Sequence, residues 1–260
     1  MSIFPSVILN SRLNFTQLFN HKYCVLCLAP GHQAICHACL QDLPGLPPAH
    51  CPSCLLPTPS SEICGTCLRN PPAWNHIRAA LRYTFPVDAL VQALKYRADL
   101  PLAPVLANLL LTRLQGDSLP DYIIPVPLHP DRLRERGFNQ ALEISRYLSK
   151  QTGCRLLPAA CIRTRRTPSQ TELPLKKRLQ NVRNAFSCGR DFSGKRVAIV
   201  DDVMTSGSTL NELAGVIRRQ GAAEVYAWAV ARAFPGKPFS GTKTDLPENL
   251  PKNQTAGKIT

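Results

Sequence analysis

The chain has 260 residues, of which 44% are hydrophobic and 18% charged, a globular composition with room for one full domain and a smaller one. Its formal net charge of +14 predicts a surface that attracts phosphates or nucleic acid. No run of 18 apolar residues and no cleavable leader pattern occur, which argues against membrane insertion and secretion. We therefore expect a cytoplasmic protein.

Four pairs of cysteines, each pair separated by two residues, lie within residues 21–70, after an extension over residues 1–20. They are Cys24 and Cys27, Cys36 and Cys39, Cys51 and Cys54, and Cys64 and Cys67. Two thiolates on one tight turn can bind one ion, and a tetrahedron of four sulfurs selects zinc. Because nothing indicates secretion, zinc is favoured over disulfides. The sequence predicts two structural zinc sites, each with four cysteine ligands.

Sequential pairing of these cysteines is favoured over an interleaved arrangement. It closes loops of only eight residues between Cys27 and Cys36 and nine between Cys54 and Cys64, at a low cost in entropy. Four nearby histidines, at positions 21, 32, 37 and 50, are read as surface residues because eight thiolates already fill two tetrahedra. The segment is rich in proline, so metal binding should drive its folding, and a closed site offers no position for catalysis.

Beyond a linker at residues 70–72, the pattern is that of an α/β domain over residues 76–234. Residues 78–85 alternate between apolar and polar side chains, as in a half-buried strand, and residues 88–97 and 101–115 predict two helices. Lys95, near the end of the first helix, could reach an anion at the sheet edge. The alternative is a solvated helix end.

A second strand is predicted at residues 122–124, where the following prolines end it. Arginines at positions 132, 134 and 136 come before a helix that begins near Gln140 and runs to about residue 152. A proline-stiffened loop faced by arginines can hold a phosphate. A salt-bridged helix start is the alternative interpretation.

A basic strip runs from Leu128 to Arg196, with sixteen Lys and Arg against five Asp and Glu. Within it, Arg163, Arg165 and Arg166 come before a polar loop and an amphipathic helix that ends near residue 183. The strip predicts affinity for polyanions, whereas a solvated basic face is the simpler alternative.

The stretch VAIVDDVMTSGSTL, residues 197–210, combines a buried strand at 197–200 with two aspartates and a run of hydroxyls. A helix follows from Leu210 to a stop at Gly221, and residues 223–230 form the next strand. The N–H groups and hydroxyls of residues 205–209 can cradle a phosphate, whereas Asp201 and Asp202 should face sugar hydroxyls or a metal. A phosphorylated sugar fits both halves, and a Ser/Thr-rich helix cap is the alternative. Residues 235–260 are read as a disordered tail.

This stretch closely resembles the phosphoribosyl-pyrophosphate (PRPP) signature of type I phosphoribosyltransferases. The resemblance implies that Asp201 and Asp202 hold the ribose hydroxyls as catalytic residues, with Arg163 and Arg165 also catalytic, on a mobile hood. It implies Mg²⁺ bound with PRPP. The implied PRPP-binding residues are Val203, Met204, Thr205, Ser206, Gly207, Ser208 and Thr209. Those implied to bind pyrophosphate are Pro125, Val126, Pro127, Leu128, Arg132, Arg136 and Lys95.

The order of these motifs, together with the four cysteine pairs, resembles the ComF family, also called ComFC or GntX-like proteins, over about residues 24–233. The resemblance implies a double zinc ribbon before a parallel-sheet, type I phosphoribosyltransferase-like α/β domain. It also implies a role in DNA uptake during natural competence or in the use of DNA as a nutrient.

Three functions remain open, one of them a regulator with the PRPP-binding fold and no catalysis. The favoured one is a PRPP-binding protein in DNA uptake that contacts single-stranded DNA through the basic strip, with the zinc ribbons docking DNA or a helicase or recombination protein. The alternative is an active Mg²⁺-dependent phosphoribosyltransferase that acts on a nucleobase in nucleotide salvage. The residues suit this chemistry, but no nucleobase pocket is identifiable.

Overall fold

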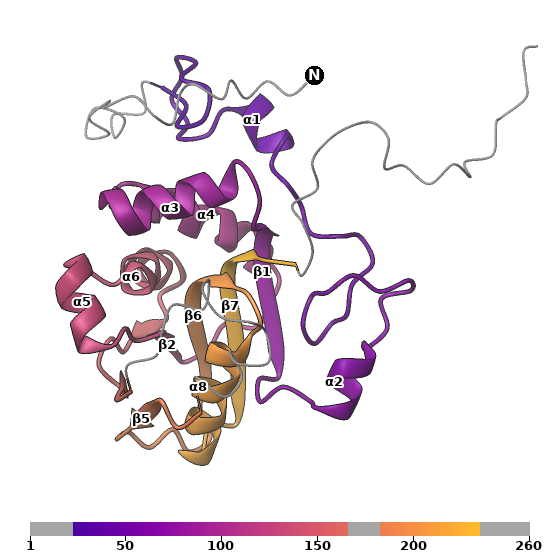
Figure 1. Cartoon of the computed structure of the whole chain (residues 1–260), viewed down its shortest axis with the longest axis vertical. Coiled ribbons are helices and arrows are strands. Elements are labelled where there is room, and N and C mark those ends of the chain that lie inside the picture. Colours follow the sequence, from indigo (N-terminus) through magenta and orange to yellow (C-terminus); the bar gives the residue numbers. More distant parts are fainter. Residues whose placement is uncertain (1–22, 166–182, 235–260) are drawn as a thin grey trace, which may run out of the picture.

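The computed structural model describes residues 23–165 and 183–234 (Figure 1). The predicted extension over residues 1–20, most of the predicted hood and the predicted tail lie outside the described residues. A five-stranded sheet forms the centre, and every neighbouring pair of its strands is parallel. This confirms the predicted parallel-sheet α/β fold.

The strand order in this sheet is β1-β7-β6-β2-β3. The strands are β1 (His76–Arg82), β2 (Tyr122–Pro125), β3 (Arg155–Leu156), β6 (Arg196–Met204) and β7 (Glu224–Arg232). The long central strands β6 and β7 are almost continuously apolar because both of their faces are covered.

Helices cover both faces of the sheet (Figure 1). Helices α3 (Val87–Arg97), α4 (Leu102–Leu114) and α6 (Gln140–Thr152) pack on one face, and α8 (Ser208–Arg219) packs on the other. Side chains alternate along β6, so Ala198 and Val200 join the first core and Val197 and Ile199 the second. The fold therefore has three layers, with the carboxyl ends of the strands at one edge.

Two smaller elements flank this edge. Helix α5 (Pro130–Arg136) follows β2, and an antiparallel pair, β4 (Cys161–Arg163) and β5 (Phe186–Cys188), forms a separate two-stranded sheet. A disulfide joins Cys161 to Cys188 across this pair. It fixes the base of the segment from which Arg163 reaches the sheet edge.

The cysteine-rich segment contains two short helices, α1 (His37–Gln41) and α2 (Gly65–Arg69). Its first half packs Val25, Leu26 and Ile35 into the core of α3 and α4, while Leu55 joins the core of α8. The segment thus shares both cores of the α/β domain, and the domain boundary between residues 70 and 76 is a proposal from composition.

Some predicted elements differ from the structure, most clearly two strand ends and one segment predicted as a loop. Strand β6 runs on to Met204 instead of ending at Val200, because Asp201 and Val203 continue the pairing with β7. Strand β1 ends at Arg82, before the exposed Phe85. The arginine-bearing segment after β2 is helix α5 and not a loop, since His129 caps it and Pro130 suits its first turn.

Candidate functional site

A pocket of about 150 Å³ opens at the carboxyl edge of the sheet, where β6 ends, the position at which open α/β sheets bind ligands. Predicted site residues from distant segments line it: Lys95, Val126, Leu128, Arg132, Arg136, Arg163, Asp201, Asp202, Val203, Met204, Thr205, Gly207 and Thr209. Five predicted residues do not line it, namely Pro125, Pro127, Arg165, Ser206 and Ser208. The fold thus brings acidic, basic and hydroxyl side chains to one place.

The two adjacent aspartates point to opposite faces of β6, because successive side chains of a strand alternate. Asp202 is 2% exposed; it forms an ion pair with Lys95 of α3 and accepts a hydrogen bond of 3.1 Å from Gln140 Nε2. Asp201 is partly exposed, and its carboxylate accepts the backbone N–H of Asp202 at 2.9 Å. The two carboxylates therefore have different surroundings.

These surroundings shift the two carboxyl groups in opposite directions. Burial, and then the negative charge of Asp202, raise the pKa of Asp201 well above its ordinary value. Burial also opposes ionisation of Asp202, but the charge of Lys95 and the hydrogen bonds from Lys95, Asp201 and Gln140 together outweigh it, so the pKa of Asp202 lies below its ordinary value. Asp202 is thus the permanent anion of the pair, and Asp201 is the one that a cation or ligand can ionise.

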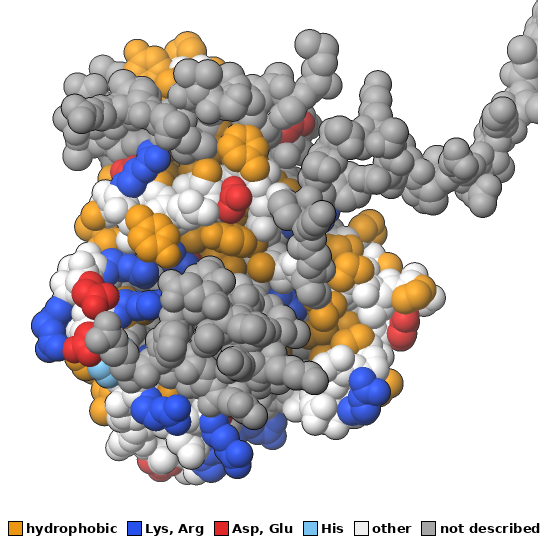
Figure 2. Space-filling view, in the orientation of Figure 1, with side chains coloured by type: hydrophobic (Ala, Val, Ile, Leu, Met, Phe, Trp, Pro, Cys, Tyr) orange, Lys and Arg blue, Asp and Glu red, His pale blue; other side chains and the backbone are white. Residues whose placement is uncertain are grey.

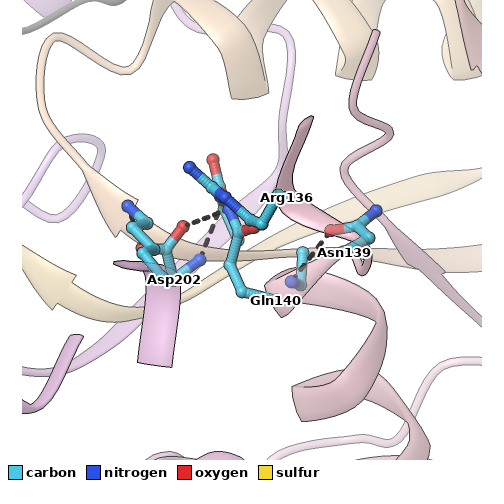
Figure 3. Close-up of polar contacts among 7 residues, drawn as sticks. Arg136, Asn139, Gln140 and Asp202 are labelled. Atoms are coloured by element: carbon cyan, nitrogen blue, oxygen red, sulfur yellow. Dashed lines mark hydrogen bonds and ion pairs between the residues drawn. The ribbon is translucent and has the colours of Figure 1, made fainter. Parts of the chain in front are cut away.

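A chain of polar contacts leads from Asp202 to the basic side of the pocket (Figure 3). Gln140 donates to Asp202 through its amide nitrogen and accepts from Arg136 Nη1 at 2.5 Å through its amide oxygen. The Arg136 guanidinium also lies 5.6 Å from the ring centre of Tyr96. Burial lowers the pKa of Arg136, and Asp202 partly opposes this. Gln140 therefore fixes the position of an arginine relative to the acidic pair.

Asn139 attaches the start of α6 to the end of β2. Its side-chain nitrogen donates to the carbonyl of Val126 at 3.0 Å, and its oxygen accepts the N–H of Ala141 at 3.0 Å as the cap of the helix. Gly137, with φ 82°, ends α5. These contacts hold the backbone between β2 and α6, from which Arg132 and Arg136 reach the pocket.

Gly207 shapes the β6–α8 loop (residues 205–207). It caps α8 with φ 78°, and a Cβ there would lie 2.7 Å from Met204 Cε and 3.2 Å from Trp74 Cη2. Only glycine fits such a position. The Ser206 and Ser208 hydroxyls, 2.8 Å apart, bond to each other beside the start of α8. The first N–H groups of this twelve-residue helix and its dipole favour an anion at the loop.

The eight CxxC cysteines form two clusters of four, whose sulfur atoms lie within 4.8 Å of one another in each. The clusters are Cys24, Cys27, Cys36 and Cys39, and Cys51, Cys54, Cys64 and Cys67. The favoured sequential pairing is confirmed. None of the described histidines belongs to either cluster.

The clusters have the dimensions of a tetrahedral sulfur site. The sulfurs of Cys27 and Cys36 are 3.6 Å apart, and those of Cys54 and Cys64 are 3.7 Å apart. Zn–S bonds of about 2.3 Å in a tetrahedron require about 3.8 Å between sulfurs.

Backbone N–H groups at matching positions support the thiolates of both clusters. Those of Cys36 and Cys64 each donate to a sulfur at 3.3 Å. Burial opposes ionisation of Cys51, but hydrogen bonds from the N–H groups of Cys64, Ser53 and Cys54 and from the Cys54 side chain together lower the pKa of Cys51 to about 7. Both clusters therefore suit a thiolate-bound metal ion.

Comparison with known proteins decides the family. Residues 100–246 match the phosphoribosyl transferase domain. The DNA utilization protein YhgH of Escherichia coli O6:H1 is 38% identical over 81% of this chain and 97% of its own length. Competence protein F of Haemophilus influenzae is 35% identical over 83% of this chain and 98% of its own length. Competence protein ComFC of Streptococcus pneumoniae is 25% identical over 80% and 92%.

The chain belongs to the ComF family. Among solved structures, the glutamine PRPP amidotransferase of B. subtilis, complexed with ADP and GMP, matches at a TM-score of 0.32 and 25% identity, over 49% of this chain and 25% of that one. A likeness of that size carries no argument. The phosphoribosyl transferase domain match leaves out α3 with Lys95 and Tyr96, and both cysteine clusters.

Four residues that line the pocket of this ComF protein were not among the predicted site residues: Tyr83, Tyr96, Gln140 and Leu210. Tyr96 and Gln140 stand next to predicted residues in the stretches LKYRAD and RGFNQ, so proximity was the available signal. Tyr83 comes directly after β1, and nothing in the alternation of that strand marks it. Arg165 is exposed and donates to the carbonyl of Arg183 at 3.1 Å.

The structure describes no helix with the length and apolar character needed to cross a membrane.

Proposed function

We propose that this ComF protein binds PRPP, or a related phosphorylated ribose, together with Mg²⁺, and acts in the uptake or use of DNA. One observation carries the ligand assignment. The carboxylate of Asp201, the start of α8 and basic side chains from three separate elements, α3, α5 and β4, converge on one pocket. A phosphorylated sugar with a second phosphate group is the ligand that such a set of groups complements.

Each part of the pocket suits a different part of this ligand. The 5′-phosphate lies at the β6–α8 loop and the start of α8, where N–H groups and the Thr205 and Thr209 hydroxyls can donate to it. Asp201 faces the ribose hydroxyls. In the free protein Asp202 contacts Lys95 and Gln140 and holds the neighbouring groups in place. Pyrophosphate then competes with Asp202 for Lys95.

Arg132, Arg136 and Lys95 bind the pyrophosphate, together with the backbone of residues 125–128. Their positive charges would stabilise pyrophosphate as a leaving group. Mg²⁺ prefers oxygen ligands, and phosphate oxygens with one carboxylate such as Asp201 provide them. When bound, the ion would neutralise charge on the pyrophosphate oxygens. We also propose that both cysteine clusters hold Zn²⁺ as structural sites.

Catalysis of phosphoribosyl transfer to a nucleobase is the second candidate function. It is favoured by Arg163 of β4, which lines the same pocket as Asp201, and by Tyr83 and Tyr96, which line it too. A positive side chain opposite a carboxylate suits a reaction in which charge develops on the sugar and the leaving group. Arg165 belongs to this proposal only if it enters the pocket when the ligand is bound.

The DNA part of the proposal comes from the relatives, which are named for DNA utilization and competence. It is supported by the excess of positive charge between residues 128 and 196. Lys and Arg side chains lie along the left and lower parts of the face in Figure 2. We propose that single-stranded DNA contacts this strip through its phosphates, that a helicase or recombination protein is a partner, and that the protein works in the cytoplasm.

Calorimetric titration of PRPP with Mg²⁺ tests the ligand assignment. Asp201→Asn should weaken binding by at least about tenfold, because a charge-assisted contact to the sugar or the ion is lost. Asp191→Asn is the matched control, since Asp191 is exposed and lies outside the pocket. Equal affinities for the wild type and Asp201→Asn would overturn the ribose assignment.

Fluorescence anisotropy with labelled single-stranded DNA tests the DNA assignment. Phosphate contacts predict an affinity that falls steeply and linearly in a plot of log K against log salt concentration, and that depends little on base sequence. Affinity that does not change with salt would contradict the proposed contact. Release of pyrophosphate in the presence of a nucleobase panel would support the transferase alternative.

A further inference from the structure

The second cysteine cluster meets the pocket at one buried arginine. Arg232 ends β7 and is 3% exposed. Its Nε donates to the carbonyl of Cys54, a member of the second cluster, at 2.9 Å. Its Nη1 donates to the carbonyls of Met204, at 3.1 Å, and of Thr205. One guanidinium thus joins the CxxC turn at residues 51–54 to the start of the β6–α8 loop.

Trp74 forms a second connection between the same two segments. Its indole nitrogen donates to the carbonyl of Ser53 at 2.9 Å. The far edge of its ring lies 3.2 Å from the position that a Cβ of Gly207 would occupy. The CxxC turn therefore supports both ends of the β6–α8 loop, one through Arg232 and the other through Trp74.

Among the described residues, the groups bonded to the Arg232 guanidinium are backbone carbonyls and not carboxylates. No Asp or Glu among the described residues forms an ion pair with it, and an unpaired buried charge is costly. The second cluster, whose Cys54 carbonyl accepts a hydrogen bond from Arg232 Nε, is the group beside the guanidinium that becomes negative when a metal is bound. Four thiolates around one Zn²⁺ carry a net charge of about −2, so a loaded second cluster would supply the counter-charge for Arg232.

The first cluster has different neighbours. Its segment packs Val25, Leu26 and Ile35 against α3 and α4. The hydrogen bonds that the structure describes for Cys24 and Cys36 join residues of that same segment. The two clusters have the same ligands and similar loops, so the first is a matched control for the second.

We propose that Arg232 is a positioning residue that couples the metal of the second cluster to the conformation of the β6–α8 loop. Affinity of the β6–α8 loop for a phosphate group then depends on metal in the second cluster and not on metal in the first. This inference rests on the proposed binding of a phosphorylated ribose at that loop. By reciprocity, a ligand at the loop must also strengthen metal binding in the second cluster by the same factor.

Hydrogen exchange of the full chain tests the coupling without any ligand. Loss of metal from the second cluster, through Cys64→Ser, should raise amide exchange around residues 204–209, and Cys36→Ser in the first cluster should leave it unchanged. Arg232→Met keeps all eight cysteines and the length of the side chain but removes the donors. It should raise exchange at the loop while both zinc ions, counted by metal analysis, stay bound.

Zinc release to a chromogenic chelator, measured with and without Mg²⁺-PRPP, tests the reciprocal effect. In the wild type, PRPP should raise the affinity of the second cluster for zinc by about tenfold, measured as the share of zinc that the chelator holds at equilibrium, within the usual range of coupling between sites. In Arg232→Met this effect should vanish, whereas Arg232→Lys should keep a fraction of it.

The outcomes separate the two proposals. If PRPP fails to bind the zinc-loaded wild type, the proposed function fails, and hydrogen exchange still decides the coupling. If Cys36→Ser and Cys64→Ser disturb the loop equally, or if Arg232→Met leaves loop exchange at the wild-type level, the coupling through Arg232 is wrong. Because Arg232→Met changes no metal ligand, misfolding of the cysteine variants would leave this last comparison valid.

Discussion

Lys95 and Asp202 form an ion pair that joins α3 to the end of β6 beneath the pocket. The Asp202 side chain is 3% exposed and that of Lys95 18%, so water screens the pair weakly. The neighbouring Asp201 forms no ion pair within the part of the chain that the structure describes. Asp202 thus stabilises the contact between α3 and β6, whereas Asp201 is available to bind a ligand.

Removal of Lys95 should therefore destabilise the fold strongly. Lys95→Met leaves the charge of Asp202 buried and should lower the free energy of unfolding by about 3–5 kcal/mol. Arg78→Met is the control, because the Arg78–Asp117 pair at 2.8 Å is much more exposed and should cost about 0–1 kcal/mol. Urea denaturation measures the free energy of unfolding of both variants. Equal losses would show that the buried Lys95–Asp202 pair contributes no more than the exposed Arg78–Asp117 pair.

This ion pair also predicts how stability depends on pH. The pKa of Asp202 is lowered in the fold, so its contribution is present above the unfolded value and is lost as pH falls through the folded pKa. Burial lowers the pKa of Lys95, but the charge and hydrogen bond of Asp202, together with the charges of Asp201 and Tyr83, raise it overall. The contribution of Lys95 is therefore lost as pH rises through the folded pKa. Stability of the wild type relative to Lys95→Met should be greatest between about pH 4 and pH 10. If the difference in stability between the wild type and Lys95→Met does not change at either end of this range, the ion pair is not its source.

Substitution of Asp201 should have opposite effects on stability and on ligand binding. Because its pKa is raised in the fold, the folded chain holds the proton more tightly than the unfolded chain, and stability falls as pH rises through that interval. Asp201→Asn should therefore stabilise the free protein at neutral pH, by about 1 kcal/mol, while it weakens binding of Mg²⁺-PRPP. Thermal unfolding and calorimetry on the same samples measure both effects.

The binding of Mg²⁺-PRPP should also strengthen with pH in the wild type as Asp201 loses its proton. Ionisation of the ligand's own phosphates also contributes to this rise in affinity with pH. The Asp201→Asn variant lacks the carboxyl group and therefore shows the contribution of the phosphates alone. The account predicts a steeper dependence in the wild type than in the variant. Parallel curves would show that Asp201 does not ionise on binding.

Gly207→Ala should damage the β6–α8 loop. Its φ of 78° and the approach of Met204 and Trp74 predict a loss of about 1–3 kcal/mol in the free energy of unfolding, and weaker phosphate binding. Gly215→Ala, inside the same helix, is the control, since its Cβ would meet nothing closer than 3.5 Å. That change should stabilise the helix by up to about 1 kcal/mol. If both changes destabilise the protein, the loss reflects a general sensitivity of α8 to substitution and not the conformation of Gly207.

Much of the fold followed from local pattern. The two long helices α3 and α4 were predicted to within about one residue, because a continuous apolar stripe marks their buried faces. The grouping of the cysteines was predictable because short loops restrict which sulfurs can meet. Helix α5 was missed, since its polar sequence buries no residue and its start depends on the His129 cap.

The sequence identified residues that line the candidate pocket, but it did not show how their side chains are arranged around it. Motifs identified Asp201, Asp202, Lys95 and Arg136, and the fold places all four around one pocket. The pattern could not show that β6 continues through the acidic pair, which sends the two carboxylates to opposite faces. Nor could it reveal Arg232, because its partners are backbone carbonyls from segments about 28 and 178 residues away along the chain.

Calorimetric titration of Mg²⁺-PRPP into the zinc-loaded full-length protein tests the central claim most directly. We expect saturable binding to one site, weakened at least about tenfold by Asp201→Asn and unchanged by Asp191→Asn. Absence of binding to the wild type, or binding that Asp201→Asn leaves unaltered, would contradict it.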